Sequence, residues 1–310
     1  MNQLVLQVSP HIHDRTSTRR IMLDVIIALF PTLVASIILF GWRSALVIAV
    51  CVSVAVLSEW LFELICKRPN TIGDLSAVVT GILLAFNLPV DVQLWQAAIG
   101  SIVAIVVVKQ LFGGIGKNFA NPAITARIVM FISFSSSMSR WVLPSIKGDA
   151  VTGATPLAVL NGVEGTLPSL KDMLLGLRGG CIGETCALTL VLGGIYLLIR
   201  KVITWHAPVS FIGTVFIFAW ILGENPLYHV LAGGLLLGAI FMATDYATTP
   251  YTKWGKVIFG VGCGIFTIVI RKWGSYPEGV SFSILFMNII TPYINTLTHS
   301  RPFGGAKNEK

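Results

Sequence analysis

Long apolar runs separated by short polar gaps are the feature that most limits what this chain can fold into. Of its 310 residues 55% are hydrophobic and only 12% are charged, whereas a soluble domain carries about twice that charged fraction. Many of the runs approach the roughly 20 residues that cross a bilayer as a helix. Because only helices and closed barrels satisfy their backbone in lipid, the sequence predicts an all-α polytopic membrane protein.

Apolar periodicity and helix-breaking residues predict about ten transmembrane helices. They are expected at residues 21–40, 44–66, 75–88, 94–112, 122–136, 180–202, 208–222, 228–243, 255–271 and 280–297. The third, fifth, seventh and eighth are short for a hydrocarbon layer about 30 Å thick, so broken or tilted helices are expected there.

The lysines and arginines between the runs orient the chain. With the N-terminus in the cytoplasm, the inner segments hold about twice as many of them as the outer segments, as cytoplasmic loops do. The net charge of +8 lies in these anchors, which face membrane lipids, so no nucleic-acid partner is expected. The expected parts are an N-terminal cytoplasmic segment 1–20, a first transmembrane repeat 21–136, an outer-face loop 137–178, a second transmembrane repeat 179–297 and a cytoplasmic tail 298–310.

Two similar stretches suggest that the chain is internally doubled. Residues 81–85 (GILLA) resemble residues 234–238 (GLLLG), and a Gly-rich span ending in a basic residue follows each, Lys109 in one case and Arg271 in the other. Five helices in each half would make the halves inverted repeats, as in many transporters. Chance similarity between two Gly/Leu-rich helices is the alternative.

A polar heptapeptide, DAVTGAT at residues 149–155, lies in the expected outer loop. Gly153 permits a positive φ and close approach of the backbone. Pro156 favours an extended Thr155, which would present its hydroxyl outward. Asp149 could bind a metal ion or assist an attacking enzyme. On composition alone, an ordinary Gly/Thr turn explains the stretch.

The heptapeptide resembles the flavin-attachment motif, acid-x-x-Ser/Thr-Gly-Ala-Ser/Thr. The residues that match its defined positions are Asp149, Thr152, Gly153, Ala154 and Thr155. The resemblance implies that a dedicated flavin transferase joins FMN through its phosphate to the Thr155 hydroxyl.

Three further stretches resemble the family of the D subunit of the Rnf electron-transport complex. They are SPHI with STRRIM within residues 9–22, GGIGKNFANPA at 113–123 and FMATD at 241–245. Ala120 departs from the aromatic residue usual at its position in this family. The related B subunit of the Na⁺-translocating NADH:quinone oxidoreductase has a longer N-terminal extension, so we expect the Rnf type.

The resemblance implies a membrane flavoprotein subunit of a ferredoxin:NAD⁺ oxidoreductase complex that couples electron transfer to Na⁺ or H⁺ translocation. It implies covalent FMN, a non-covalent riboflavin, a bacterial inner membrane with the Thr155 loop on the periplasmic side, and the A, B, C, E and G proteins of the complex as partners. The chain has no Gly-rich nucleotide motif after a strand and no iron–sulfur cysteine cluster, so no catalytic residue is expected in this chain alone. The alternative function is a solute channel or transporter built from broken-helix repeats.

Polar residues near the expected inner face are candidates for the second flavin. Asn118 and Asn121 offer the amide groups that a flavin pyrimidine edge needs, and Gly114 permits close approach to a flat ring. A helix N-cap before Pro122 explains Asn121 equally well. Asp245 could bind a coupling cation or a flavin hydroxyl, or serve as a loop acid or salt-bridge partner.

The remaining charged and metal-binding residues have simpler explanations. Glu59 and Glu63 share one helix face near the inner surface, where solvation at the interface is expected. Arg127 falls inside a span, where snorkelling or pairing is expected. The histidines lack metal spacing and the cysteines suit small buried thiols, so no metal site made by this chain alone is expected.

Overall fold

The computed structural model describes residues 16–144, 153–274 and 278–299 of the chain. Four helices in these ranges are long and apolar enough to cross a membrane. They are α1 (Thr18–Phe40), α2 (Trp42–Ile65), α13 (Lys253–Trp273) and α14 (Val280–Thr298). The side chain of Ser17 caps α1 by accepting from the Arg20 backbone N–H, and Gly41 ends the helix with a φ of 74°.

Five further apolar stretches form helices that are shorter than a bilayer is thick, as the sequence predicts for several of them. They are α3 (Ser76–Phe86), α4 (Leu94–Ile102) with its π-helical continuation η2 (Val103–Gln110), α5 (Pro122–Ser133), α9 (Ala187–Ile199) and α10 (His206–Ile221).

The expected helix 228–243 is broken, as its length suggested. It consists of α11 (Pro226–Leu231), α12 (Leu235–Leu237) and the π-helical η4 (Gly238–Met242). The break lies at Gly233 and Gly234, and Gly233 has a φ of 64° that most residues avoid. Short helices outside the apolar stretches are η1 (Ile72–Asp74), α6 (Ser135–Met138), α7 (Pro156–Leu160) and α8 (Leu170–Leu175).

The expected helix 180–202 is wrong over its first turns, because α9 begins only at Ala187. The preceding backbone bonds to the first half of the chain instead: Ile182 N–H donates to Leu88 O and Gly183 N–H to Phe86 O, both at 3.0 Å. A Cβ on Gly183 would overlap Phe86. A Gly-rich apolar segment therefore looks helical in sequence but serves as a closely packed connection.

The helices of the first half (α1 to α5) pack against one another in a pattern similar to that of the second half (α9 to α14). Within the first half α2 packs against α3 and α4, and within the second α10 packs against α11 and α13. The halves meet where α1 lies beside α9 and α5 beside α14. Each half therefore has its own helix packing, and the two halves are joined along these two helix pairs.

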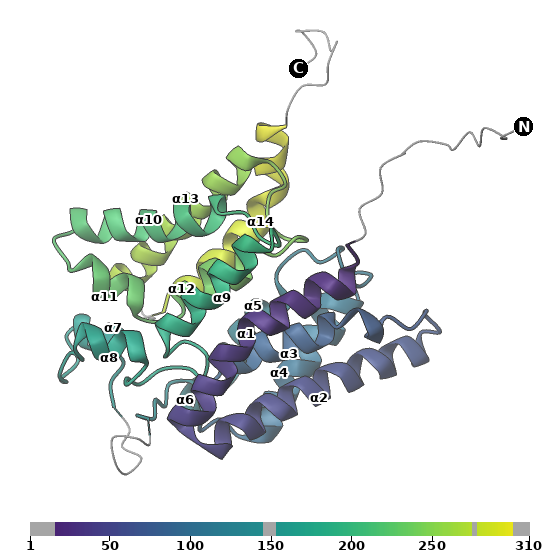
Figure 1. The fold of residues 1–310 in the computed structure, drawn as a ribbon, viewed down its shortest axis with the longest axis horizontal. Helices are drawn as coiled ribbons and strands as arrows, with labels where there is room; N and C mark the ends of the chain where they lie inside the picture. The colour runs from purple at the N-terminus through teal and green to yellow at the C-terminus, as the bar shows by residue number, and fades with distance from the viewer. Residues whose placement is uncertain (1–15, 145–152, 275–277, 300–310) are drawn as a thin grey trace, which may run out of the picture.

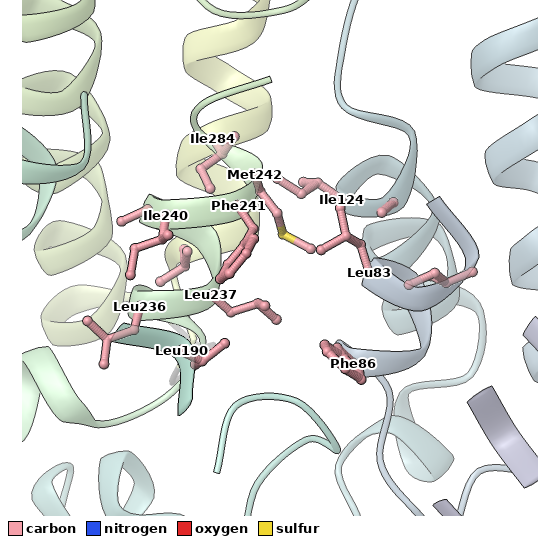
Figure 2. Packing of buried hydrophobic residues seen from close by; sticks show 14 of the residues in the cluster. Leu83, Phe86, Ile124, Leu190, Leu236, Leu237, Ile240, Phe241, Met242 and Ile284 are labelled. Carbon is pink, nitrogen blue, oxygen red and sulfur yellow. The ribbon is translucent and has the colours of Figure 1, made fainter. Parts of the chain in front are cut away.

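A shared apolar core joins the halves (Figure 2). It brings together Leu83, Phe86 and Ile124 of the first half with Leu190, Leu237, Phe241 and Met242 of the second half.

The start of α1 and the end of α14 lie toward one end of the bundle, whereas α6, α7 and α8 lie toward the opposite end (Figure 1). We call these the near end and the far end.

Candidate functional site

The described part of the heptapeptide forms the start of α7, at the far end. Thr155 has the predicted extended backbone, with φ −68° and ψ 154°, and is the N-cap of α7. Its Oγ1 accepts from the Ala158 backbone N–H at 3.2 Å. The side chain is only 6% exposed, so the expected outward hydroxyl is wrong. The first amides of a helix lack carbonyl partners, and the threonine oxygen turns inward to supply one.

The other residues of the heptapeptide have simple surroundings or lie outside the described residues. Gly153 does not use a positive φ; its N–H donates to Trp141 O at 3.1 Å. A Cβ on Gly165 would lie 3.8 Å from the Ala154 Cβ. Asp149 and Thr152 lie outside the described residues, as does the SPHI stretch.

The helix α7 is held against the break between α11 and α12. Leu157 packs with Met173 and Ala232 in a small apolar cluster. The Asn161 amide donates to Arg271 O at 3.0 Å. Thr155 therefore lies on a segment that packs against both the rest of the loop 137–178 and the second half of the chain.

A group of four buried charged residues and the half-buried Glu278 lies next to α7, and we call it the far cluster. Its members are Arg127, Arg178, Glu184, Arg271 and Glu278.

Arg127 of α5 is the centre of the far cluster. It pairs with Glu278 and, at 3.3 Å, with Glu184. It also donates to Asn87 Oδ1 and Ser281 Oγ, both at 3.0 Å. The pairing expected for an arginine within a span is confirmed, and its partners come from both halves.

The two other arginines of the far cluster bind carbonyl oxygens. Arg178 donates to Glu184 O at 2.7 Å, and Arg271 donates to His229 O at 2.6 Å and Ala232 O at 3.1 Å. Burial and the neighbouring Glu278 raise the pKa of Glu184 above its ordinary value.

The far cluster also brings together three possible metal-ligating atoms. Single atoms of Cys181, Glu184 and Glu278 lie within 4.8 Å of one another. Arg127 pairs with both carboxylates and donates to Cys181 Sγ at 3.5 Å. The three residues are therefore arranged around a guanidinium group, which occupies the electrostatic role of a cation.

At the near end, the structure brings the candidate second-flavin residues together. Asn118, Asn121 and Asp245 line one cavity of about 100 Å³, together with Lys109. A second cavity of about 280 Å³ adjoins it and shares Asp245. We call the first of these the near cavity. Gly114, expected to let the backbone approach a flat ring, has a positive φ of 90° but does not line this cavity.

The two asparagines of the near cavity differ in how many of their amide atoms lack a hydrogen-bond partner. Asn121 caps α5, because its Oδ1 accepts from the Ala123 and Ile124 amides at 3.1 and 3.3 Å. Its Nδ2 donates to Met242 O at 3.4 Å. The Asn118 Oδ1 atom, by contrast, is buried without a hydrogen-bond partner, so Asn118 is the more available group for a ligand.

Asp245 lies just after η4, where the two cavities meet. Its carboxylate accepts from Thr248 Oγ1 at 3.1 Å and from the Ala247 N–H at 3.5 Å. Burial raises the pKa of Asp245 above its ordinary value. No ion-pair partner of Asp245 occurs in the part of the chain that the structure describes, so the salt-bridge alternative is not supported there.

A second buried ionic group adjoins the near cavity; we call Glu59, Glu63 and Lys109 the near cluster. Lys109 Nζ lies 2.7 Å from Glu59 Oε1 and donates to Ser76 Oγ at 2.6 Å. Glu63 accepts from the hydroxyl and the N–H of Thr71. Both carboxylates are buried, so the expected solvation at the membrane interface is wrong: Lys109 and Gln110 bond to Glu59, and Thr71 bonds to Glu63.

Sequence reasoning missed Glu184 and Glu278 as partners of Arg127. Glu184 is the one acid in the apolar stretch 179–199. An acid in such a stretch usually pairs inside the bundle, and that signal could have identified it.

Residues 16–144, 153–274 and 278–299 form a helical bundle with four membrane-length helices, a broken helix and enclosed ion pairs, which is the architecture of a polytopic membrane protein. The chain belongs to the NQR2, RnfD, RnfE family, whose model matches residues 5–304.

Three relatives of the chain are each named as the D subunit of an ion-translocating complex. The chain is 46% identical to the D subunit of the Na⁺-translocating ferredoxin:NAD⁺ oxidoreductase complex of Acetobacterium woodii, covering 100% of this chain and 99% of that protein. It is 42% identical to the proton-translocating counterpart of Clostridium ljungdahlii, covering 98% and 97%. It is 35% identical to the D subunit of the ion-translocating oxidoreductase complex of Stutzerimonas stutzeri, covering 94% and 93%.

Proposed function

We propose that the chain is the D subunit of an ion-translocating ferredoxin:NAD⁺ oxidoreductase complex in a bacterial inner membrane. The observation that carries the proposal is the 46% identity over the whole chain to a protein of that name. The A, B, C, E and G proteins of the complex then supply the ferredoxin and NAD⁺ chemistry. The coupling ion stays open between Na⁺ and H⁺, because relatives of nearly equal identity are named for each.

We propose that Thr155 carries FMN through a phosphoester. The Thr155 oxygen would attack the FMN phosphorus of FAD, the phosphoanhydride bond to AMP would break, and the hydroxyl proton would leave with AMP. The cap of α7 is compatible with this product, because Oγ1 only accepts a hydrogen bond from Ala158. Since Thr155 is buried, the transferase must act while the start of α7 is open.

We propose that the near cavity, together with the cavity of about 280 Å³ that adjoins it at Asp245, holds the non-covalent riboflavin. Its support is the unpartnered Asn118 Oδ1 beside Lys109 and Asp245. Asn118 would bind the pyrimidine edge of the ring, and Asp245 a ribityl hydroxyl. A flavin there supplies single-electron transfer close to the end where α1 begins.

The proposed arrangement has ten membrane crossings in two inverted repeats, with the near end in the cytoplasm. The matching helix contacts of the two halves support it. Two basic residues support it further: Lys109 lies beside the start of α3, and Arg271 binds the break before α12. With about 30 Å of hydrocarbon between the ends, the two flavins would need relay centres in neighbouring proteins of the complex.

Intact mass and in-gel flavin fluorescence test the covalent FMN. The full chain is expressed with the flavin transferase, and the mass of one FMN minus water is expected on the wild type and absent from Thr155→Ala. Ser169→Ala is the matched control, because Ser169 caps α8 in the same loop with the same type of bond. A wild-type chain at its bare polypeptide mass after co-expression would refute the attachment.

The alternative of a solute transporter is tested separately. Substrate uptake by the lone chain in liposomes, with no electron donor present, would favour it over the redox role.

A further inference from the structure

The far cluster carries more positive than negative charge although it is buried. Three arginines, Arg127, Arg178 and Arg271, stand against the carboxylates of Glu184 and Glu278, and each arginine is at most 6% exposed. Guanidinium groups stay protonated in proteins. Among the described residues the excess is one positive charge when both glutamates are ionised, and two when Glu184 is protonated.

The hydrogen bonds of Arg178 and Arg271 to neutral acceptors do not cancel this excess of positive charge. The carbonyl oxygens that Arg178 and Arg271 bind carry no net charge. The Nε atoms of both side chains are buried without a hydrogen-bond partner. Burial lowers the pKa of Arg178 to about 10, although Glu184 and Glu278 oppose the shift. A buried charge without a counter-charge is costly, so the site suits one more anion.

The far cluster adjoins the chain on both sides of Thr155. After Thr155, a Cβ on Gly233 would lie 2.9 Å from Leu157 Cδ1 and 3.3 Å from Arg271 Nη2. Before Thr155, a Cβ on Gly179 would lie 3.8 Å from Gly153 O. Arg178 and Thr155 are therefore one and two residues away from this backbone contact.

We propose that the far cluster supplies the counter-charge for a phosphodiester on Thr155, and that Arg178 positions this anion. The inference rests on the proposed covalent FMN. A phosphodiester between Thr155 and the ribityl chain carries one negative charge, which balances the smaller excess of the far cluster. The free Nε–H of Arg178 offers it a charge-assisted hydrogen bond.

Thermal melting of loaded and unloaded protein tests the proposal. The full chain is prepared with and without the transferase as wild type, Arg178→Gln and Lys171→Gln, and intact mass confirms loading. Lys171 is the matched control, because it is an exposed cation in the same loop. Loading is expected to raise the melting temperature of the wild type and Lys171→Gln, but not that of Arg178→Gln. An equal rise in all three would overturn the proposal.

A second measurement needs no variant. Inorganic phosphate, compared with chloride at equal ionic strength, is expected to raise the melting temperature of the unloaded wild type more than that of the loaded wild type. Equal shifts would overturn the proposal while leaving the covalent FMN intact. A wild type that gains no mass would instead refute the proposed attachment, and the inference with it.

Discussion

The near cluster and the far cluster each include a basic residue beside the start of a short helix, but the two clusters have opposite net charge. Lys109 lies at the start of α3 and Arg271 at the break before α12, each at the beginning of a short helix. The near cluster has one cation for two buried carboxylates, whereas the far cluster has three cations for two. Two buried basic residues in similar local settings, Lys109 and Arg271, therefore have surroundings of opposite charge.

The largest expected effect is the loss of the only cation of the near cluster. Lys109→Met leaves Glu59 and Glu63 buried without a counter-charge, and breaking a buried pair in this way costs about 3–5 kcal/mol. Denaturant unfolding of the purified chain measures the cost. Lys109→Met with Glu59→Gln is expected to recover part of it. A single-variant cost near that of an exposed lysine would show that the near cluster is not closed.

The far cluster is expected to be sensitive to the loss of an acid. Glu278→Gln removes a charged partner of Arg127 and increases the positive excess, at a cost of about 2–3 kcal/mol. Glu63→Gln, which relieves the negative excess of the near cluster, is the comparison and is expected to cost less. The same denaturant unfolding assay checks both, and the reverse order would break the contrast between the clusters.

A smaller effect is expected from the cap of α7 alone. In the protein without flavin, Thr155→Ala removes the acceptor for the Ala158 N–H. The loss lowers the stability of α7 by about 1 kcal/mol. Faster amide hydrogen exchange in α7 measures it. Thr155→Ser keeps the oxygen and should exchange like the wild type; fast exchange in the serine variant would contradict the capping role.

The smallest effect concerns an ion pair at the surface, outside both clusters. Partial burial alone would raise the pKa of Glu224, but bonds from Lys272 and His229 hold this pKa below its ordinary value of 4.5. The Glu224 ion pair contributes at most about 1 kcal/mol to the free energy of unfolding. This contribution is present above pH 4.5 and is lost as the pH falls through the lowered pKa. Melting temperatures between pH 6 and pH 3 should fall more steeply for the wild type than for Glu224→Gln; parallel curves would exclude the contribution.

The sequence predicted what local pattern determines. Apolar runs located the long helices, and Asn121 before Pro122 gave the cap of α5. The shortness of the expected helix 228–243 predicted a broken or tilted helix, and the structure places the break at Gly233 and Gly234.

What the sequence did not reveal depends on contacts between distant segments. The partners of Arg127 come from residues 184 and 278, and no local pattern relates them. The buried Thr155 hydroxyl and the non-helical residues 180–186 have the same cause. In each case a backbone N–H bonds to an acceptor that becomes available only in the folded chain.

The connection at Ile182 and Gly183 limits how the molecule moves. Two backbone hydrogen bonds join this connection to Leu88 and Phe86 of the first half. The Phe86 side chain also leaves no room for a side chain at Gly183. If one half rocked over the other, as in alternating-access carriers, these two hydrogen bonds would have to break. The freed N–H and C=O groups would then lie unpaired in an apolar interior. Two halves joined in this way suit a rigid scaffold better than a moving gate.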